Sequence, residues 1–282
     1  MSRTTIIDAI VNLVNNPIIT LGREYRSRNR ANSMGEALEE YVKDLFAGTF
    51  KCEPQERYDR FERVFSYIGN NSNPPDAMLR GGDAIEVKKI ESLDASLALN
   101  SSYPKHMLRA DSPMISDACR NAERWTEKDM LYVVGVVQNN MLRHLAMVYG
   151  LDYCASENCY RSLKTRIAQG VNAIEGVEFS QTRELGRINR VDPLGITYMR
   201  VRGMWGIENP WSAFDYVYQR DMRRQLNFMC LVNREKWERI PDRERLLEAI
   251  RANPRLTLSD VRVKNPDNPA KLNDAVLISF SV

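Results

Sequence analysis

Hydrophobic residues recur along the chain at two spacings, and together these predict a fold that mixes helices with strands. Segments 5–15 and 33–47 carry apolar residues about every 3.6 positions, which predicts amphipathic helices, and Gly48 suits the end of the second one. Further helices are predicted over 114–127, 157–169, a stretch after Pro210, and 241–252.

Strands are predicted where apolar residues alternate or form short runs. Segment 83–91, DAIEVKKIE, alternates by two, which places Ile85 and Val87 on one face and Glu86 and Lys88 on the other. Turn-forming residues at 69–75 predict a loop. Further strands are predicted at 62–68, 131–137, 142–150, 196–203 and 275–282. This mixture predicts an α/β or α+β class, with a central mixed sheet flanked by helices.

Nothing in the sequence divides the chain into separate units. It shows no repeat and no linker rich in Gly or Ser, so we expect one domain over 1–282, with the irregular stretch 185–232 as an insertion. The 282 residues are 43% hydrophobic and 27% charged, which is typical of a soluble globular protein. Five cysteines, no signal peptide and no apolar run of about 20 residues predict a cytoplasmic protein without a membrane partner.

The charge balance excludes a strongly polybasic protein. Lys plus Arg number 40 and Asp plus Glu 37, so the formal net charge is only +3. A nucleic-acid ligand would therefore require a local concentration of positive charge.

One short stretch combines residues that suit metal-assisted hydrolysis. Pro74, Pro75 and Asp76 precede Glu86 and Lys88, which share one face of the predicted strand. Two carboxylates brought together repel each other unless a divalent cation lies between them, and Mg²⁺ prefers carboxylate and phosphate oxygens. A neighbouring lysine can help to activate a metal-bound water. The alternative is a solvated strand face, on which Glu and Lys are common.

These residues resemble the PD-(D/E)xK nuclease superfamily, and longer strings resemble type II restriction endonucleases of the NgoPII type. The strings are GEALEEYVKDLF (35–46), SYIGNNSNPPDAMLRGGDAIEVKKIES (66–92), LALNSSYPK (97–105), HLAMVYGLDYC (144–154) and GRINRVDPLGITYMRVRGMWGIENPW (186–211). The resemblance implies a restriction-endonuclease-like core and an Mg²⁺-dependent enzyme that cuts duplex DNA at a palindrome, with GGCC expected, leaving 5′-phosphate and 3′-hydroxyl ends. It also implies a prokaryotic source and a partner DNA methyltransferase, with no stable complex expected. Symmetric cutting of both strands calls for a homodimer.

The resemblance also assigns roles to individual residues. Asp76 and Glu86 match the family's metal-binding acids, and Lys88 matches its catalytic lysine. Glu39 resembles a further acid that many members carry on a preceding helix, but Glu36 and Glu40 compete with it. The alternative for these three glutamates is a solvated helix face. Asp83 is another nearby acid, at the start of the predicted strand, where a role in the turn is favoured over metal binding.

A stretch rich in arginine is the predicted DNA-contacting region. Residues 183–224 hold eight arginines, no lysine and five acids, a local excess of three positive charges. The forked guanidinium binds guanine edges or phosphates bidentately. The candidates are Arg187, Asn189, Arg190, Arg200 and Arg202, with Arg200 and Arg202 predicted to share a strand face. Ordinary surface salt bridges are the alternative.

Polar residues on either side of the predicted metal site are further DNA-binding candidates. Asn71 and Asn73 precede Asp76 and could contact the backbone or the minor groove. Ser101, Ser102 and Lys105 follow the predicted strand and could hold phosphates; turn chemistry is the alternative for both groups.

Three functions therefore compete. The first is a site-specific restriction endonuclease, the second a nuclease of the same fold for DNA repair or junction processing, and the third a non-enzymatic DNA-binding protein with a degenerate core. A cut at a fixed sequence would separate the first two, and metal-dependent cleavage would exclude the third.

Overall fold

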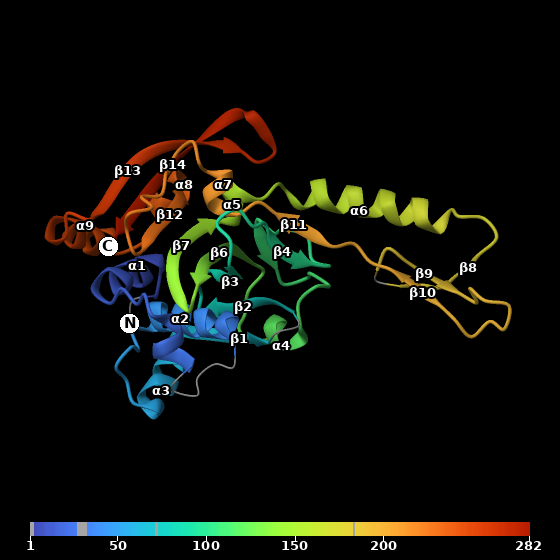
Figure 1. Cartoon of the computed structure of the whole chain (residues 1–282), viewed down its shortest axis with the longest axis horizontal. Helices are drawn as coiled ribbons and strands as arrows, with labels where there is room; N and C mark the ends of the chain where they lie inside the picture. The colour runs from blue at the N-terminus through green and yellow to red at the C-terminus, as the bar shows by residue number, and fades with distance from the viewer. Residues whose placement is uncertain (1–2, 27–32, 71–72, 183) are drawn as a thin grey trace.

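A mixed β-sheet forms the body of the protein (Figure 1). The computed structural model describes residues 3–26, 33–70, 73–182 and 184–282. Among these, the main sheet has nine strands in the order β1-β2-β3-β6-β7-β12-β14-β13, with β5 paired to β6. Their bounds are β1 Phe65–Asn70, β2 Asn73–Leu79, β3 Ala84–Ile90, β5 Met107–Arg109, β6 Glu127–Gln138, β7 Met141–Tyr149, β12 Asn227–Asn233, β13 Leu256–Asn265 and β14 Asn268–Ser281. The β3–β6 and β7–β12 pairs are parallel and the others antiparallel, which confirms the predicted class.

Helices cover both faces of this sheet. On one face, α1 and α2 pack against β-strand residues in a large apolar core, bounded further by α3, α8 and α9. Gly135 of β6 lies so close to Leu38 of α2 that a Cβ at Gly135 would come within 2.6 Å of that side chain. A second apolar core lies on the opposite face, against α4, α5 and α7. The bounds are α1 Ile6–Asn15, π-helix η1 Gly22–Arg26, α2 Met34–Ala47, α3 Pro54–Val64, α4 Asp117–Arg120, α5 Gly150–Tyr153, α7 Pro210–Ala213, α8 Arg234–Arg239 and α9 Arg243–Ala252.

An arm projects from the body (Figure 1). It consists of α6 Glu157–Asn172 and a three-stranded sheet of β8 Glu178–Phe179, β9 Gly186–Asn189 and β10 Met199–Val201. Helix α6 buries none of its 16 residues. The chain returns along β11 Trp205–Ile207, which pairs with β4 Leu97–Asn100. We call residues 157–204 the arm.

The structure confirms most predicted elements and corrects several. The helices predicted over 5–15, 33–47, 157–169 and 241–252, and the strands predicted over 83–91, 131–137, 142–150 and 275–282, are present with shifted ends. The prediction of a helix over 114–127 is wrong, because only Asp117–Arg120 is helical and β6 begins at Glu127. Ser116 caps this one turn, and the Trp125 indole donates to the Arg120 carbonyl, which ends the helix in a turn.

Other predicted boundaries are also corrected. The predicted loop 69–75 is largely a hairpin, since β1 runs to Asn70 and β2 begins at Asn73. The predicted strand 62–68 begins only at Phe65, because α3, which was not predicted, ends at Val64. In 196–203 only Met199–Val201 is a strand, and the helix after Pro210 has four residues. No helix in the described part of the chain is long and apolar enough to cross a membrane.

Candidate active site

The acids and lysine singled out in the sequence come together on two adjacent strands. Strand β2 runs antiparallel to β3, with Ala77 opposite Ile85. The main-chain N–H of Val87 donates to Asp76 Oδ2 at 2.6 Å, and Lys88 Nζ donates to Glu86 Oε1 at 2.6 Å. The hairpin therefore places Asp76 beside Glu86 and Lys88, as the spacing predicts. We call these three residues the acid–lysine cluster.

Electrostatics in this cluster are typical of a site that binds a cation. Burial, with the nearby Glu86 carboxylate, raises the pKa of Asp76 to about 8. Burial acts to lower the pKa of Lys88, but the carboxylates of Glu86 and Asp76 outweigh it and leave that pKa above its usual value. Without a cation, Asp76 therefore resists ionisation beside the Glu86 carboxylate, while Lys88 is held as an ammonium.

The donor set fits a divalent cation of the magnesium kind. Glu86 Oε2 is buried and has no hydrogen-bond partner in the structure, so one carboxylate oxygen is left to accept a ligand. Within the described ranges, no group of three or more His, Cys, Asp or Glu side chains is gathered for metal binding. Mg²⁺ commonly takes one or two carboxylates and completes its shell with water and phosphate. Asp76 and Glu86 match that requirement.

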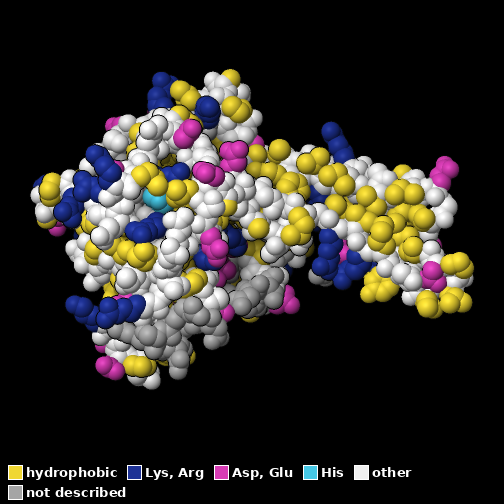
Figure 2. Space-filling view, viewed as in Figure 1, with side chains coloured by type: hydrophobic (Ala, Val, Ile, Leu, Met, Phe, Trp, Pro, Cys, Tyr) yellow, Lys and Arg dark blue, Asp and Glu magenta, His cyan; other side chains and the backbone are white. Residues whose placement is uncertain are grey.

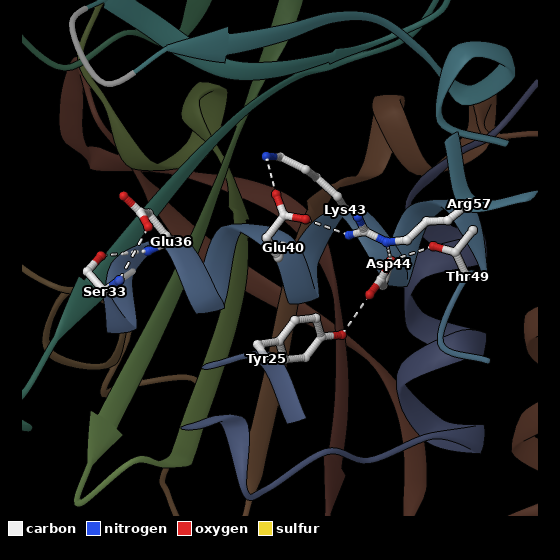
Figure 3. Close-up of polar contacts among 8 residues, drawn as sticks. All are labelled: Tyr25, Ser33, Glu36, Glu40, Lys43, Asp44, Thr49 and Arg57. Atoms are coloured by element: carbon white, nitrogen blue, oxygen red, sulfur yellow. Dashed lines mark hydrogen bonds and ion pairs between the residues drawn. The ribbon is translucent and has the colours of Figure 1, made fainter. Parts of the chain in front are cut away.

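Two of the three candidate glutamates on α2 are engaged elsewhere (Figure 3). Glu36 closes the capping box of α2 by accepting from the Ser33 main-chain N–H at 3.3 Å. Glu40 accepts from Lys43 at 2.8 Å and from Arg57 at 2.6 Å. Neither contact is directed at the acid–lysine cluster.

Glu39 is the glutamate of α2 whose charge acts on the cluster. It interacts electrostatically with both Lys88 and Asp76, from a helix that packs against β3. Burial raises the pKa of its carboxyl group. The packing of α2 thus brings the charge of Glu39 close to Asp76 and Lys88.

A buried polar network fixes α2 in this orientation (Figure 3). Asp44 accepts hydrogen bonds from Tyr25 at 2.9 Å, Thr49 at 2.5 Å and Arg57 at 2.8 Å. These contacts tie α2 to η1 and to α3, and Asp44 is fully buried. Because a buried carboxylate is costly unless its oxygens are bonded, the network strongly favours a single position of α2.

The cluster opens into a cavity of about 570 Å³ between the body and the base of the arm. The cavity is lined by Asn73, Asp76, Glu86, Lys88, Ser101, Ser102, Lys105, Lys164, Glu184 and Arg202, together with apolar and other neighbours. Of the predicted DNA-contacting residues, the structure brings Asn73, Ser101, Ser102, Lys105 and Arg202 to the cavity that holds the acids. Asn71 lies outside the described residues.

The four predicted arginines and Asn189 all belong to the arm. Arg200 forks onto Glu184 at 2.8 and 2.6 Å, and Arg202 pairs with the same carboxylate. The two arginines share a partner, but they do not share a strand face as predicted, because β10 ends at Val201 and Arg202 follows it. Strand β9 contains Arg187 and Asn189, and Arg190 follows it. The Arg187 guanidinium lies over the Tyr198 ring, 4.4 Å from its centroid, and Arg190 lies 3.5 Å from Glu178. Figure 2 shows basic side chains gathered where the lower edge of the arm approaches the body.

Asp83 is separate from the acid–lysine cluster. Its main-chain carbonyl accepts from Leu79 in the β2–β3 turn, in line with the favoured turn role. Its buried carboxylate accepts from Tyr149 at 2.7 Å and from Lys236 at 2.6 Å. These partners make Asp83 a core ion-pair residue.

Sequence reasoning missed the residues that join the arm to the cavity. Tyr103, Tyr160 and Trp205 form an aromatic cluster with ring centroids 5.7–6.1 Å apart. Glu184, the shared partner of the arm arginines, was also missed. These residues come from separate segments, so no local spacing could have indicated the contacts.

Comparison with known proteins gives one consistent result. The family described as NgoPII restriction endonuclease matches residues 4–264. The chain is 56% identical over 276 residues to "Type II restriction enzyme NgoPII" of Neisseria gonorrhoeae, a match that covers 98% of this chain and 99% of the relative. No solved structure is significantly similar to the chain. The matched residues include the β2–β3 hairpin, the cavity and the arm.

Proposed function

Because the chain belongs to the NgoPII restriction endonuclease family, and is thus a type II restriction endonuclease acting on DNA, we propose that it hydrolyses duplex DNA at a short G/C palindrome, with GGCC expected. The proposed cofactor is Mg²⁺, bound by Asp76 and Glu86. The observation that carries the proposal is the β2–β3 hairpin, which brings these two carboxylates and the Lys88 ammonium to one cavity.

The chain's own residues prepare the phosphodiester for attack by water. A bound Mg²⁺ supplies charge neutralisation and a more acidic water. Asp76 and Glu86 would hold the ion, and Lys88, 2.6 Å from Glu86, would compensate the negative charge that develops on the phosphate. The water oxygen bonds to phosphorus and gives up a proton as the bond between phosphorus and the 3′ oxygen breaks. The 3′ oxygen takes up a proton and leaves as a hydroxyl, and the new end is a 5′-phosphate.

Glu39 is proposed as the helix acid of the site. Its electrostatic interaction with both Lys88 and Asp76 supports this role, whereas Glu36 and Glu40 have other partners. A carboxylate near the ammonium of Lys88 can fix the orientation of that group toward the water or phosphate.

DNA recognition is assigned to the arm and to the cavity wall. Arg187, Asn189, Arg190, Arg200 and Arg202 are the proposed arm contacts, within the proposed insertion 185–232. Asn73, Ser101, Ser102 and Lys105 are proposed to meet the backbone, since they line the cavity that holds the acids. Glu184 keeps the guanidinium groups of Arg200 and Arg202 oriented together.

We further propose a homodimer, because symmetric cutting of a palindrome requires two active sites. The arm offers a surface for self-association: Figure 2 shows apolar side chains gathered over it. Its exposed apolar residues are Leu163, Ile167, Ile174, Val177, Val191, Leu194, Ile196, Tyr198, Met199 and Met204. A partner DNA methyltransferase would protect the host's own sites without forming a stable complex with this enzyme.

Digestion of a sequenced plasmid with Mg²⁺, followed by sequencing of the ends, tests the proposed function. We expect a fixed set of fragments whose ends all fall within one short palindrome. Random nicking, or cleavage confined to branched DNA, would contradict the proposal and favour a repair or junction nuclease.

A further inference from the structure

Lys105 is a buried lysine that forms no ion pair with an acidic side chain in the part of the chain that the structure describes. Two lysines are buried in the described part of the chain, Lys105 and Lys128, with 9% and 5% of their surface exposed. Lys128 pairs with Glu123 at 2.5 Å and also donates to two main-chain carbonyls. Lys105 donates instead to the hydroxyl of Ser102 and, at 3.4 Å, to the Tyr103 carbonyl, and it forms no ion pair with any described residue.

The main chain of Lys105 is held directly behind the acid cluster. Tyr132 stands opposite Glu86 in the parallel β3–β6 ladder. Its hydroxyl accepts from the Lys105 N–H at 2.8 Å and donates to the Lys105 carbonyl at 3.2 Å. Gly150 packs against the same carbonyl so closely that a Cβ there would lie 2.4 Å from it. Lys105 is therefore fixed relative to Glu86 by the core of the sheet.

The Lys105 side chain lines the cavity that holds the acids. Its charge interacts with Glu86 and with Lys88, so the ammonium groups of Lys105 and Lys88 both lie near the Glu86 carboxylate. Burial lowers the pKa of Lys105, as expected for a cation removed from water without a full counter-charge. An ammonium has three donors, and a buried one without an anionic partner is costly unless an anion enters the site.

We propose that Lys105 is a second cationic catalytic residue, whose ammonium binds the scissile phosphate while Lys88 acts beside the metal-binding acids. This inference rests on the proposed function and deepens it, because it assigns a particular phosphate to Lys105. The entering phosphate supplies the counter-charge that the body of the protein does not provide.

The base of the arm packs against the residue that orients Lys105. Tyr103, whose carbonyl accepts from Lys105, stacks on Tyr160 of α6 at 5.8 Å and meets Trp205 of β11 edge-on at 6.1 Å. Its hydroxyl also donates to Glu157 of α6 at 2.9 Å. DNA contacts along the arm can therefore influence the position of Lys105 through this aromatic cluster.

The assignment is tested by removing the charge of Lys105 and, separately, the charge of the scissile phosphate. Once the cut position is mapped, Lys105→Met and wild-type enzyme are bound, without divalent metal, to two cognate duplexes. One duplex is unmodified, and the other carries an uncharged methylphosphonate at the scissile position. We expect the substitution to weaken binding of the unmodified duplex about tenfold and to have little effect on the modified one. The single-turnover cleavage rate should fall ~10²-fold or more.

Controls separate this role from a structural one. Lys89→Met, on the other face of β3, should change neither binding nor rate, and Lys105→Gln serves as a second neutral variant if Lys105→Met does not fold. An unchanged cleavage rate in a folded variant, or equal loss of affinity for the two duplexes, would overturn the inference. Failure of wild-type enzyme to cut with Mg²⁺ would instead overturn the proposed function itself.

Discussion

The main-chain N–H of Val87 donates to the carboxylate of Asp76 at 2.6 Å, and this contact fixes the acid beside the preceding residue of β3, Glu86. Replacing either acid with alanine should therefore abolish cleavage by removing a proposed metal ligand. DNA affinity should remain largely intact, because it comes mainly from basic contacts elsewhere. Gel-shift binding and plasmid cleavage measure the two effects. Residual cutting within tenfold of wild type by Asp76→Ala would contradict the assignment.

Lys88 should be essential for rate. Lys88→Ala removes the ammonium held 2.6 Å from Glu86, so we expect cleavage to slow by ~10²-fold or more. Lys89→Ala is the matched control, since Lys89 pairs with Glu91 at 2.6 Å. Single-turnover rates of the two variants make the comparison. Equal losses would show that the side chain of Lys88 has no special role.

The raised pKa of Asp76 predicts how stability depends on pH without metal. An acid whose pKa is raised in the folded state binds its proton more tightly there, so its stabilisation is present below the unfolded pKa. It is lost as pH rises toward about 8. The melting temperature of metal-free wild type should therefore fall more between pH 5 and 8, roughly the titration range, than that of Asp76→Asn. Thermal melts at several pH values provide the measurement, and parallel curves for the two proteins would rule out the predicted linkage.

Substitutions on α2 should distinguish the three glutamates. Glu39→Gln should lower the cleavage rate, because it removes a charge that acts on both Lys88 and Asp76. Glu36→Gln should leave that rate nearly unchanged and affect stability by about 1 kcal/mol or less, since Glu36 caps the helix. Cleavage rates and melting temperatures of both variants are compared. A larger rate loss for Glu36→Gln would reverse the assignment.

Arg200 and Arg202 provide the test of sequence recognition. If one of them reads a guanine edge, its replacement should cost ~1–3 kcal/mol and relax discrimination at one base pair. If it contacts only phosphate, binding should weaken evenly on all sequences, and the salt slope should fall by about one. Cognate and single-mismatch duplexes, titrated at several salt concentrations, separate these outcomes. If Arg187 and Arg190 variants behave like wild type as well, recognition lies outside these four residues.

The sequence predicted the centre of the site because its geometry is local. Alternation in 83–91 placed Glu86 and Lys88 on one face, and the short connection before them allowed Asp76 to return beside β3. For the three glutamates Glu36, Glu39 and Glu40, no local signal in the sequence distinguishes one from another, because tertiary contacts determine which face of α2 packs against the sheet. Those contacts support Glu39 as the proposed helix acid.

The features that were missed depend on contacts between distant segments. The arm joins the body through β4 and β11, with Trp205 opposite Asn100, and neither strand has a strong pattern of its own. The placement of Lys105 depends on Tyr132 of β6 and on Gly150 at the start of α5, both distant from Lys105 in the sequence. A helix was predicted over 114–127, but only Asp117–Arg120 is helical and β6 begins at Glu127.

The requirement for a metal held by Asp76 and Glu86 is tested most directly by the Mg²⁺ dependence of single-turnover cleavage on a duplex with a mapped site. Wild type should be inactive in metal-free buffer and should recover fully when Mg²⁺ is restored, whereas Glu86→Ala should stay inactive at every Mg²⁺ concentration. Cleavage by metal-free wild type, or recovery of the wild-type rate by Glu86→Ala at high Mg²⁺, would contradict the account.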